Sequence, residues 1–355
     1  MKIKSVNYWK QNLDLKRPYS IAYKTINSVV SAFLEITLEN GMTGIGAANT
    51  SPYVVGEDVE GTMRVLETDV MDWLMGKDIR NIHLLLEQLV QKFPTTPGVR
   101  ATADIALYDA FSKYLDVPLV SYLGQHVEKM ATSVTIGIKN VEDTLEEAQE
   151  FVDSGFRILK VKLGNDLEED IERLVKLRER FGYKIIIRID SNQGYTVDQF
   201  KEFFNRTADL DIELNEQPLK EDKINEMKSL PHEIKMTMAA DETLVSPQDA
   251  FVLAAPPQAS GIFNIKLMKT GGIHQALKIA RIAEIANIEL MWGCNDESLV
   301  GIAAALHAAF SSPNTKYIDL DGSLDLARDV VSGGFILEDG YMRPNGKPGI
   351  GVERV

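Results

Sequence analysis

Three acidic residues each end a short, β-rich apolar segment of this 355-residue chain: Asp190, Glu216 and Asp241. If the three segments are neighbouring parallel strands, their carboxyl ends meet at one edge of the sheet and bring the three carboxylates together. Hard oxygen ligands on separate strands suit Mg²⁺ in octahedral coordination. Any one of these residues alone would more often be a loop cap or a salt-bridge partner, but the joint pattern favours a metal site.

Lysines end two further segments and predict acid–base chemistry beside the carboxylates. Lys160 and Lys162 are two positions apart, so on a strand both side chains point to the same face. A neighbouring ammonium group disfavours the charged form, and we therefore expect Lys160 to lower the pKa of Lys162 toward the range of a general base. The alternative is a solvated basic face, which is more typical of a helix than of a strand end.

Lys266 ends a segment four strands further along, which in a closed ring of eight strands is the side opposite Lys162. Two amines on opposite sides of a bound carbon can remove a proton from one face and return it to the other. A metal ion would stabilise the enolate formed from a carboxylate. This is the geometry of a racemase, and the simpler alternative is a strand-end lysine paired with Asp241 or Glu297.

The elements that must position these residues recur from about residue 130 onward. β-rich apolar segments alternate there with longer stretches in which apolar and charged residues have helical spacing. This alternation predicts a parallel sheet, and eight repeats are the number that closes it into a barrel with its active site at the carboxyl ends of the strands. The eight segments are Thr132–Gly137, Phe156–Leu163, Lys184–Asp190, Asp211–Glu216, Lys235–Asp241, Gly261–Lys266, Ile288–Gly293 and Lys316–Asp321.

The first part of the chain lacks this repeat and predicts a separate α+β domain. The Asn40-Gly41 pair between two strand-like runs is a strong hairpin signal, and it favours an antiparallel sheet. Helical stretches follow the sheet and would pack on it. The strand-like stretches are Ile3–Lys10, Val29–Leu38 and Thr43–Ala47, and the helical ones are Glu57–Met75, Asn81–Lys92 and Val99–Tyr114.

Charge and cysteine content exclude several classes of function. The formal net charge is −14 at pH 7, and an acidic surface repels nucleic-acid phosphates and anionic lipid heads, so we expect neither partner. Cys294 is the only cysteine and cannot form a disulfide within the chain, which fits a reducing compartment. The N-terminus has no apolar run of signal-peptide length, and the apolar stretch Gly301–Phe310 is too short to span a membrane. The sequence therefore predicts a cytoplasmic protein.

A series of motifs runs through essentially the whole chain. They are Ala106-Leu-Tyr-Asp109 with Pro118 and Leu123-Gly124, Lys160-Val-Lys162, Asp190-Ser-Asn192-Gln193-Gly194, Glu216-Gln217-Pro218, Asp241-Glu242, and Lys266 followed by Gly271-Gly272. In these residues the chain resembles the enolase superfamily and, within it, the muconate-lactonising enzyme subgroup, which contains the dipeptide epimerases. The resemblance implies an α/β fold: a modified (β/α)7β TIM barrel in residues 126–325 and an N-terminal α+β capping domain in residues 1–125. We expect the C-terminal segment, residues 326–355, to pack back on the capping domain.

The resemblance also implies roles for individual residues. Asp190, Glu216 and Asp241 would bind one Mg²⁺ per subunit, and Lys162 and Lys266 would exchange the proton α to a carboxylate through an enediolate. Relatives of this kind assemble as homo-oligomers, and we expect the same here. Supporting roles are expected for Lys160, Asn192, Glu242 and Glu297, of which Glu297 would pair with Lys266 or line the site.

Two strand ends decide the branch of the subgroup. The seventh segment ends Trp292-Gly-Cys-Asn-Asp-Glu-Ser298 without a histidine, which argues against the mandelate-racemase branch and its histidine base. The eighth carries Asp319-Leu-Asp321, which resembles the Asp-x-Asp signature of dipeptide epimerases, because a pair of anions binds the α-ammonium group of a dipeptide. The simpler alternative is a helix-capping or solvated Asp pair. Thr135, on the first barrel strand, is also expected to contact the substrate.

Specificity is expected to come from the capping domain. Pro18–Ile26 and Thr50–Val55 are predicted to be mobile loops that close over the site. Lys24 falls where Ala-Glu epimerases of this group resemble one another in carrying a cation for the glutamate side chain, which favours an acidic C-terminal residue. Its neighbours Tyr19, Ile21 and Tyr23 would instead suit an apolar one.

The sequence therefore predicts a Mg²⁺-dependent dipeptide epimerase that inverts Cα of the C-terminal residue of an L-Ala-L/D-Glu or hydrophobic L-Ala-Xaa dipeptide. The main alternative is another reaction of the same subgroup: muconate cycloisomerisation, o-succinylbenzoate synthesis or N-acylamino acid racemisation. Cycloisomerases and succinylbenzoate synthases act on substrates without an ammonium group for the Asp pair. A third alternative is a barrel that serves only as a binding or scaffold protein, which the intact lysines and carboxylates oppose.

Overall fold

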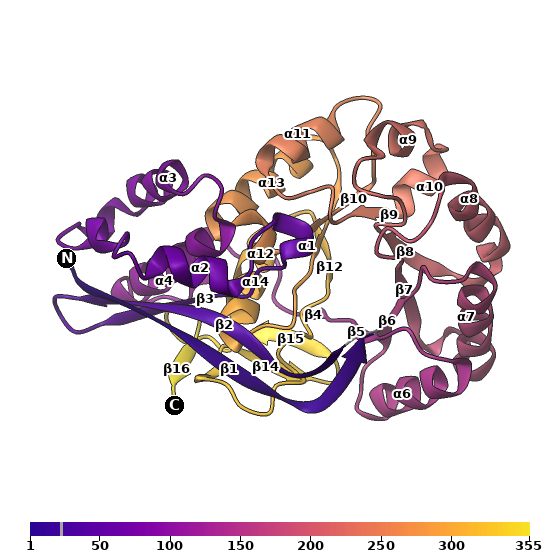
Figure 1. Cartoon of the computed structure of the whole chain (residues 1–355), viewed down its shortest axis with the longest axis horizontal. Coiled ribbons are helices and arrows are strands. Elements are labelled where there is room, and N and C mark those ends of the chain that lie inside the picture. Colours follow the sequence, from indigo (N-terminus) through magenta and orange to yellow (C-terminus); the bar gives the residue numbers. More distant parts are fainter. Residues whose placement is uncertain (22–23) are drawn as a thin grey trace.

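Two regions of different architecture make up the chain (Figure 1). The computed structural model describes residues 1–21 and 24–355, and side chains outside residues 17–26. An antiparallel sheet with helices forms the N-terminal region, and a parallel sheet with outer helices forms the larger region that follows. This confirms the predicted α/β barrel with an N-terminal α+β part.

The N-terminal sheet has the order β1-β2-β3 within the described residues, with β1 at Ile3–Ile21, β2 at Lys24–Leu38 and β3 at Thr43–Ala48. Both pairs are antiparallel, and Gly41 has a φ of +87° in the turn between β2 and β3, as the hairpin signal predicted. The pairing of β1 with β2 continues to Ile21 and Lys24. The predicted loop over Pro18–Ile26 is therefore mostly strand, because main-chain pairing extends a strand where side-chain alternation gives no signal.

Helix α4, Pro97–Tyr114, is buried along almost its whole length and packs directly on β3. A Cβ atom at Gly46 would lie 1.9 Å from the carbonyl oxygen of Thr102, and one at Gly44 would lie 2.3 Å from that of Ala106. The two glycines thus permit an unusually close contact between strand and helix.

The predicted helix over Glu57–Met75 ends early in the structure. Asp69 has a φ of +55°, and an L-residue in the left-handed region cannot continue a right-handed helix. A short 3-10 turn follows. The remaining helical elements of this region are α1 Pro52–Val55, α2 Val59–Leu66, η1 Asp72–Leu74, η2 Ile79–Asn81, α3 Ile82–Lys92 and α5 Leu119–Leu123.

In the described chain, eight parallel strands form the barrel sheet in the order β12-β11-β10-β9-β8-β7-β6-β5. The ring closes where Thr132, just before β5, forms a parallel bridge with Ile318 of β12. The backbone N–H of Ser133 also donates to the Ile318 carbonyl at 3.2 Å. The strands are β5 Val134–Ile136, β6 Ile158–Lys162, β7 Ile186–Asp190, β8 Ile212–Glu216, β9 Met238–Ala240, β10 Ile262–Ile265, β11 Glu289–Trp292 and β12 Thr315–Ile318.

Helices cover the outside of the barrel, and one of them replaces part of a predicted strand. Residues 235–237 belong to α10, whose start follows Pro231, a residue that suits the beginning of a helix. The predicted strand Lys235–Asp241 is correspondingly shorter. The helical elements are α6 Val141–Asp153, α7 Leu167–Phe181, η3 Gly182–Lys184, α8 Val197–Arg206, η4 Ala208–Leu210, α9 Ile224–Ser229, α10 His232–Thr237, α11 Pro247–Ala254, α12 Leu267–Thr270, α13 Ile273–Ile285 and α14 Leu299–Phe310.

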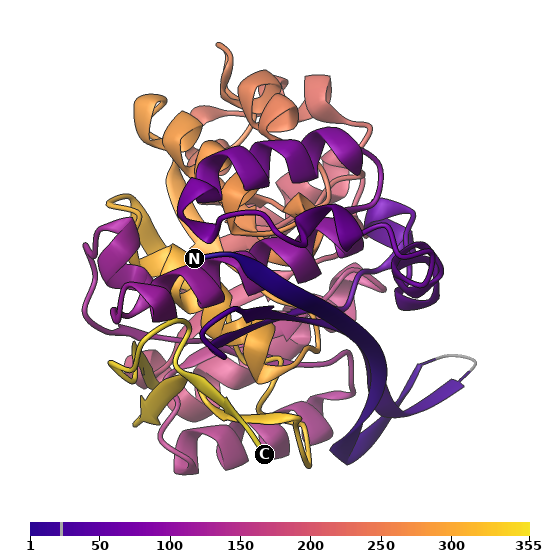
Figure 2. The ribbon, with the colours of Figure 1, turned by 90° about the vertical axis from the view of Figure 1, so that its left-hand side faces the viewer.

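The C-terminal segment, yellow in Figure 2, contacts the N-terminal region through a buried aspartate. Asp109 of α4 accepts hydrogen bonds from the backbone N–H of Ile45 in β3, at 3.0 Å, and of Ile350, at 2.9 Å. This gives the Ala106–Asp109 motif a structural role. The short strands of this part are β4 Met130–Ala131, β13 Val331–Gly333, β14 Phe335–Glu338, β15 Tyr341–Pro344 and β16 Val352–Arg354.

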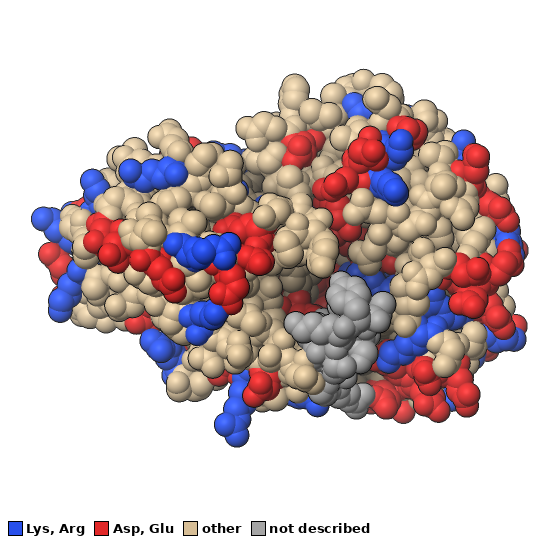
Figure 3. Space-filling model, viewed as in Figure 1, with Lys and Arg blue, Asp and Glu red and all other residues tan. Residues whose placement is uncertain are grey.

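The surface fits the acidic composition. Acidic and basic side chains are intermixed over the face shown in Figure 3. Of the helices in the described ranges, none is both long and apolar enough to cross a lipid bilayer.

Candidate active site

The three carboxylates predicted to bind a metal lie at adjacent strand ends. Asp190 ends β7 and is the register partner of Glu216, which ends β8, and Asp241 follows β9 directly. All three are buried. Burial and the neighbouring Asp190 carboxylate raise the pKa of Glu216 to about 7. The sheet thus gathers negative charge where the sequence predicted it.

The two predicted acid–base lysines reach this group from different strands. Lys162 Nζ lies 2.6 Å from Asp190 Oδ2, and Lys266 Nζ lies 2.8 Å from Asp241 Oδ2 and 3.6 Å from Glu216 Oε1. Lys266 is the single residue between β10 and α12, and Lys162 is the last residue of β6. A substrate carbon above the carboxylates would therefore have an amine on each side.

Lys160 does not have the environment that we expected. Its Nζ contacts Asp319 Oδ2 and lies 3.3 Å from Glu216 Oε2 and 3.7 Å from Asp190 Oδ2. Burial opposes its charge, but these carboxylates outweigh burial and raise the pKa of Lys160 well above its ordinary value. Burial likewise opposes the charge of Lys266, and Asp241 and Glu216 outweigh it and raise its pKa. For Lys160 our prediction considered only the neighbouring lysine and left out these carboxylates. For Lys266, the pair with Asp241 that we named as the alternative is formed.

The donor set fits a hard divalent cation. Three buried carboxylates from rigid strand ends supply oxygen ligands of the kind that Mg²⁺ prefers. As they stand, no group of three or more Asp, Glu, His or Cys side chains in residues 1–16 and 27–355 is disposed to hold a metal ion. Lysine ammonium groups instead pair with the carboxylates, and a cation would have to take their place on at least some of the oxygens.

Two buried residues of this cluster were missed from the sequence. Lys269 Nζ contacts Asp241 Oδ1 and donates to the Asp241 carbonyl at 2.6 Å and to the Asn264 carbonyl at 3.0 Å. Asn264 Nδ2 donates to Glu216 Oε1 at 2.7 Å. Asn264 lies two positions before Lys266, so strand periodicity could have found it. No pattern indicated Lys269, because the short helix α12 that carries it was not predicted.

Asn192 and Glu242 extend the cluster next to Lys162. Asn192 Oδ1 accepts from Lys162 Nζ at 2.9 Å, and its Nδ2 donates to Glu242 Oε1 at 3.5 Å. The other oxygen of Glu242 is buried without a hydrogen-bond partner among the described residues. Both residues therefore lie where supporting roles were predicted.

Glu297 and Lys266 do not bond to each other among the described residues. It accepts from the backbone N–H of Asn295 at 3.1 Å, and burial raises its pKa to about 8. The ion pairs of Lys266 in the described part of the chain are with Asp241 and Glu216. The expected Lys266–Glu297 pair is thus not formed, because closer carboxylates take the ammonium.

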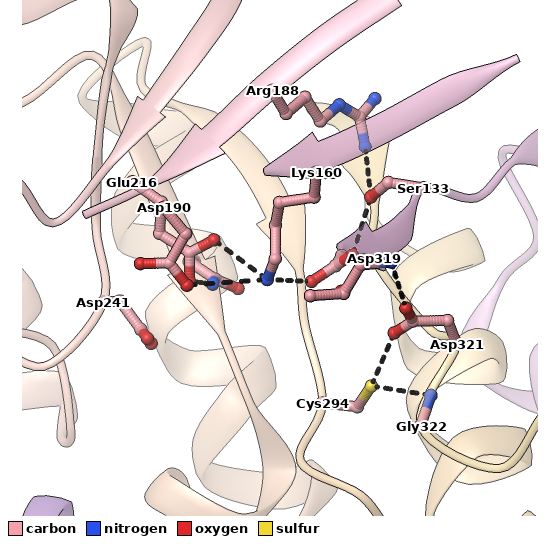
Figure 4. Close-up of polar contacts among 12 residues, drawn as sticks. Ser133, Lys160, Arg188, Asp190, Glu216, Asp241, Cys294, Asp319, Asp321 and Gly322 are labelled. Atoms are coloured by element: carbon pink, nitrogen blue, oxygen red, sulfur yellow. Dashed lines mark hydrogen bonds and ion pairs between the residues drawn. The ribbon is translucent and has the colours of Figure 1, made fainter. Parts of the chain in front are cut away.

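The Asp pair after β12 has two different environments (Figure 4). Asp319 contacts Lys160 and accepts from the Ser133 hydroxyl at 2.7 Å. Asp321 accepts from the backbone N–H of Thr135 at 2.8 Å, and its other oxygen lies 3.8 Å from Cys294 Sγ. Burial and the Asp319 charge raise the pKa of Asp321 to about 7. Asp321 therefore has no ion pair with a cationic side chain among the described residues.

Segments of the N-terminal region contact the loops at the barrel mouth. Asn49, after β3, donates from Nδ2 to the Asp296 carbonyl at 2.6 Å, and Asn295 Nδ2 donates to the Asn49 carbonyl at 2.8 Å. Part of the predicted loop Thr50–Val55 forms helix α1. The side chains of Lys24, Tyr19 and Tyr23 lie outside the described residues.

Two family models match the chain. Residues 3–124 match the N-terminal domain of mandelate racemase / muconate lactonizing enzyme, and residues 143–354 match the family described as enolase C-terminal domain-like. Together they span both regions of the structure.

Relatives with described activities are similar to this chain over almost all of its length. An L-Lys-D/L-Arg epimerase from Desulforapulum autotrophicum is 51% identical over 100% of both chains. The crystal structure of a dipeptide epimerase from Methylococcus capsulatus, complexed with Mg and L-Arg-D-Lys, matches with a TM-score of 0.97 and 48% identity over 99% of each chain. A dipeptide epimerase from Enterococcus faecalis, complexed with Mg and L-Leu-L-Tyr, matches with a TM-score of 0.92 and 34% identity over 99% of this chain and 100% of that one.

Proposed function

We propose that this chain, which belongs to the mandelate racemase / muconate lactonizing enzyme family of the enolase superfamily, is an isomerase that epimerises dipeptides. The observation that carries the proposal is the pair of lysines, Lys162 and Lys266, each within 2.8 Å of a different carboxylate of one buried acidic cluster. The relatives with dipeptide complexes support the same reaction class.

One Mg²⁺ held by Asp190, Glu216 and Asp241 would bind the carboxylate of the substrate's C-terminal residue and stabilise the charge that develops when the α-proton leaves. Lys162 and Lys266 carry the protons: Nζ of one removes the α-proton, and Nζ of the other returns a proton to the opposite face. Loss of the proton from either epimer gives the same planar carbon, so the exchange runs in both directions.

The charge pattern around the site supports one orientation of the dipeptide. The α-ammonium group of the N-terminal residue binds near Asp321, whose partly buried carboxylate has no cationic partner of its own in the described chain. An N-acylated substrate would leave this charge unpaired. This favours free dipeptides over N-acylamino acids and over the carbocyclic acids of cycloisomerases.

The side chains of the substrate are the point where we depart from the sequence prediction. We expected an acidic or hydrophobic C-terminal residue, but the two more similar relatives described above act on, or are complexed with, dipeptides of lysine and arginine. We therefore propose cationic dipeptides. The loops after β8 and β11 carry Glu221, Asp222 and Asp296, and negative charge in these loops would favour such side chains.

Deuterium incorporation tests the reaction and the substrate together. A library of L,L-dipeptides is incubated with the enzyme and Mg²⁺ in D₂O, and one-dalton gains are scored by mass spectrometry. We expect gains for dipeptides of lysine and arginine, and little for L-Ala-L-Glu or L-Leu-L-Tyr. Gains confined to L-Ala-L-Glu or hydrophobic dipeptides would contradict the cationic preference. Exchange of N-acylamino acids alone would contradict the dipeptide reaction itself.

A further inference from the structure

We propose that Ser133 and Arg188 are positioning residues that hold Asp319 on Lys160, and that Asp321 alone is thereby left to bind the α-ammonium group of the substrate. This division of labour rests on the proposed epimerase function. It gives the two carboxylates of the Asp-x-Asp motif different tasks.

The closure of the barrel places two residues at β5 opposite the two aspartates that follow β12. Ser133 and Thr135 are two positions apart on and before β5, and Asp319 and Asp321 are two positions apart after β12. Ser133 bonds Asp319 through its hydroxyl, and Thr135 bonds Asp321 through its backbone N–H. Each carboxylate thus takes a contact from the strand across the seam.

Arg188 determines which way the Ser133 hydroxyl points. Arg188 Nη1 lies 3.3 Å from Ser133 Oγ, and a guanidinium group can only donate. The single hydroxyl proton of Ser133 is then free for Asp319 Oδ1 at 2.7 Å, in preference to the Ile318 carbonyl at 3.4 Å. Figure 4 shows this continuous path from Arg188 through Ser133 and Asp319 to Lys160.

Arg188 is itself held on several sides. It is buried inside the barrel on β7, and Nη1 also donates to the Ile318 carbonyl at 2.8 Å. Its Nε donates to Glu213 Oε2 at 2.6 Å, and its guanidinium group lies over the ring of Tyr317, 5.2 Å from the centroid. An arginine fixed in this way is a rigid donor below the active site.

The consequence is that both oxygens of Asp319 are occupied. Oδ1 accepts from Ser133 and Oδ2 contacts Lys160, so this charge is neutralised within the protein. Asp321 has one oxygen on a backbone N–H and the other beside Cys294 Sγ, which is a weak donor at 3.8 Å. Asp321 is partly buried and lacks a cationic partner among the described residues, and a substrate ammonium group supplies the missing charge.

The test compares two substitutions of the motif and one of the positioning chain in the Mg²⁺-loaded enzyme. Asp321→Asn is expected to raise KM for a Lys-Arg dipeptide on the order of 100-fold with kcat changed far less. Asp319→Asn and Ser133→Ala are expected to lower kcat, the latter about ten-fold, with KM within about three-fold. Ser112→Ala is the matched control, since the hydroxyl of this buried serine donates to the Tyr108 carbonyl within α4, away from the active site.

Two results would overturn the proposal. Equal increases in KM for Asp319→Asn and Asp321→Asn would mean that both carboxylates bind the ammonium group. Kinetics of Ser133→Ala equal to those of Ser112→Ala would remove the positioning role. A crystal structure of Ser133→Ala provides a readout that does not need activity, because the Lys160–Asp319 contact is expected to open. A wild-type enzyme without activity on any dipeptide would refute the proposed function, while this structural readout would still decide the role of Ser133.

Discussion

Buried carboxylates occur in two regions of this protein, at the barrel mouth and where the N-terminal region packs on the barrel, and they have different partners. At the mouth, Asp190 and Asp319 face lysines, which outweigh burial and lower the pKa of both. In the packing region, the hydrogen bonds that Asp104 accepts from the described residues come from the backbone N–H groups of Ile273 at 2.6 Å and His274 at 3.1 Å, and burial raises its pKa to about 7.

The difference shows what each region does with charge. Ammonium partners keep Asp190 and Asp319 ionised at the mouth, and a substrate or cation can exchange for these partners. The backbone partners of Asp104 satisfy hydrogen bonds at the start of α13 without neutralising the charge. The first arrangement serves chemistry and the second joins two parts of the chain.

The largest expected effect comes from removing either lysine that faces the substrate. Lys162→Met or Lys266→Met should reduce epimerisation roughly 10³-fold, because each step loses its acid or base. Each variant is assayed by NMR for α-proton exchange, starting from each epimer separately. Lys176→Met, which removes an exposed lysine paired with Glu179, serves as the control. Wild-type exchange from both epimers in either lysine variant would refute the assigned roles.

Lys269 tests whether the ion pairs at the mouth organise the metal site. Lys269→Met removes the contacts to Asp241 and should raise the Mg²⁺ concentration for half-maximal activity by roughly 10–100-fold. Binding of Mg²⁺ measured by calorimetry should weaken in parallel. Lys113→Met removes a comparable lysine from the buried Asp109 in the N-terminal region and should leave Mg²⁺ binding unchanged. An unchanged Mg²⁺ dependence of Lys269→Met would show that Lys269 only stabilises the fold.

Asp104 is expected to make the stability of the packing region depend on pH. Its pKa is higher in the folded state than the ordinary value of 3.8, so the folded protein holds its proton over a range in which the unfolded chain loses it. This contribution to the free energy of unfolding is complete below pH 3.8 and is lost as the pH rises to about 7. Asp104→Asn should therefore flatten this decrease, by a few kcal/mol at most.

The measurement for Asp104 is urea unfolding between about pH 4 and pH 8, with the difference between variant and wild type taken at each pH. Other buried acids contribute to the pH dependence of the free energy of unfolding in both proteins. The difference between the two proteins isolates the contribution of Asp104. Asp198→Asn, at an exposed position in the first turn of α8, is the control. The same pH dependence in Asp104→Asn and wild type would contradict the raised pKa.

The smallest expected effect is at the contact between the N-terminal region and the mouth. Asn49→Ala removes the hydrogen bond to the Asp296 carbonyl and should lower the free energy of unfolding by about 1 kcal/mol. We expect KM to rise a few-fold, since the loop after β11 loses one restraint, while kcat changes little. An exposed asparagine, Asn225→Ala on α9, provides the comparison. A large decrease in kcat would instead place Asn49 in the catalytic machinery.

Much of the fold could be predicted because each strand and helix has its own local pattern. Strand-end residues such as Asp190 and Lys162 were found because a barrel places its active site at those ends. The extension of β1 to Ile21 and the helical residues 235–237 were not found, since they depend on pairing and on a proline-started helix. Lys269 was missed for a similar reason.

The sequence by itself determined which residue types stand at the strand ends, because burial on one face of a strand enforces a period of two along the chain. Only the tertiary structure decided which groups meet. Closure of the ring brings Ser133 to Asp319, and the barrel interior brings Lys160 to three carboxylates. Partners that lie 186 residues apart, as Ser133 and Asp319 do, are set by strand register and by the favourable pairing of buried charges, which no local pattern encodes.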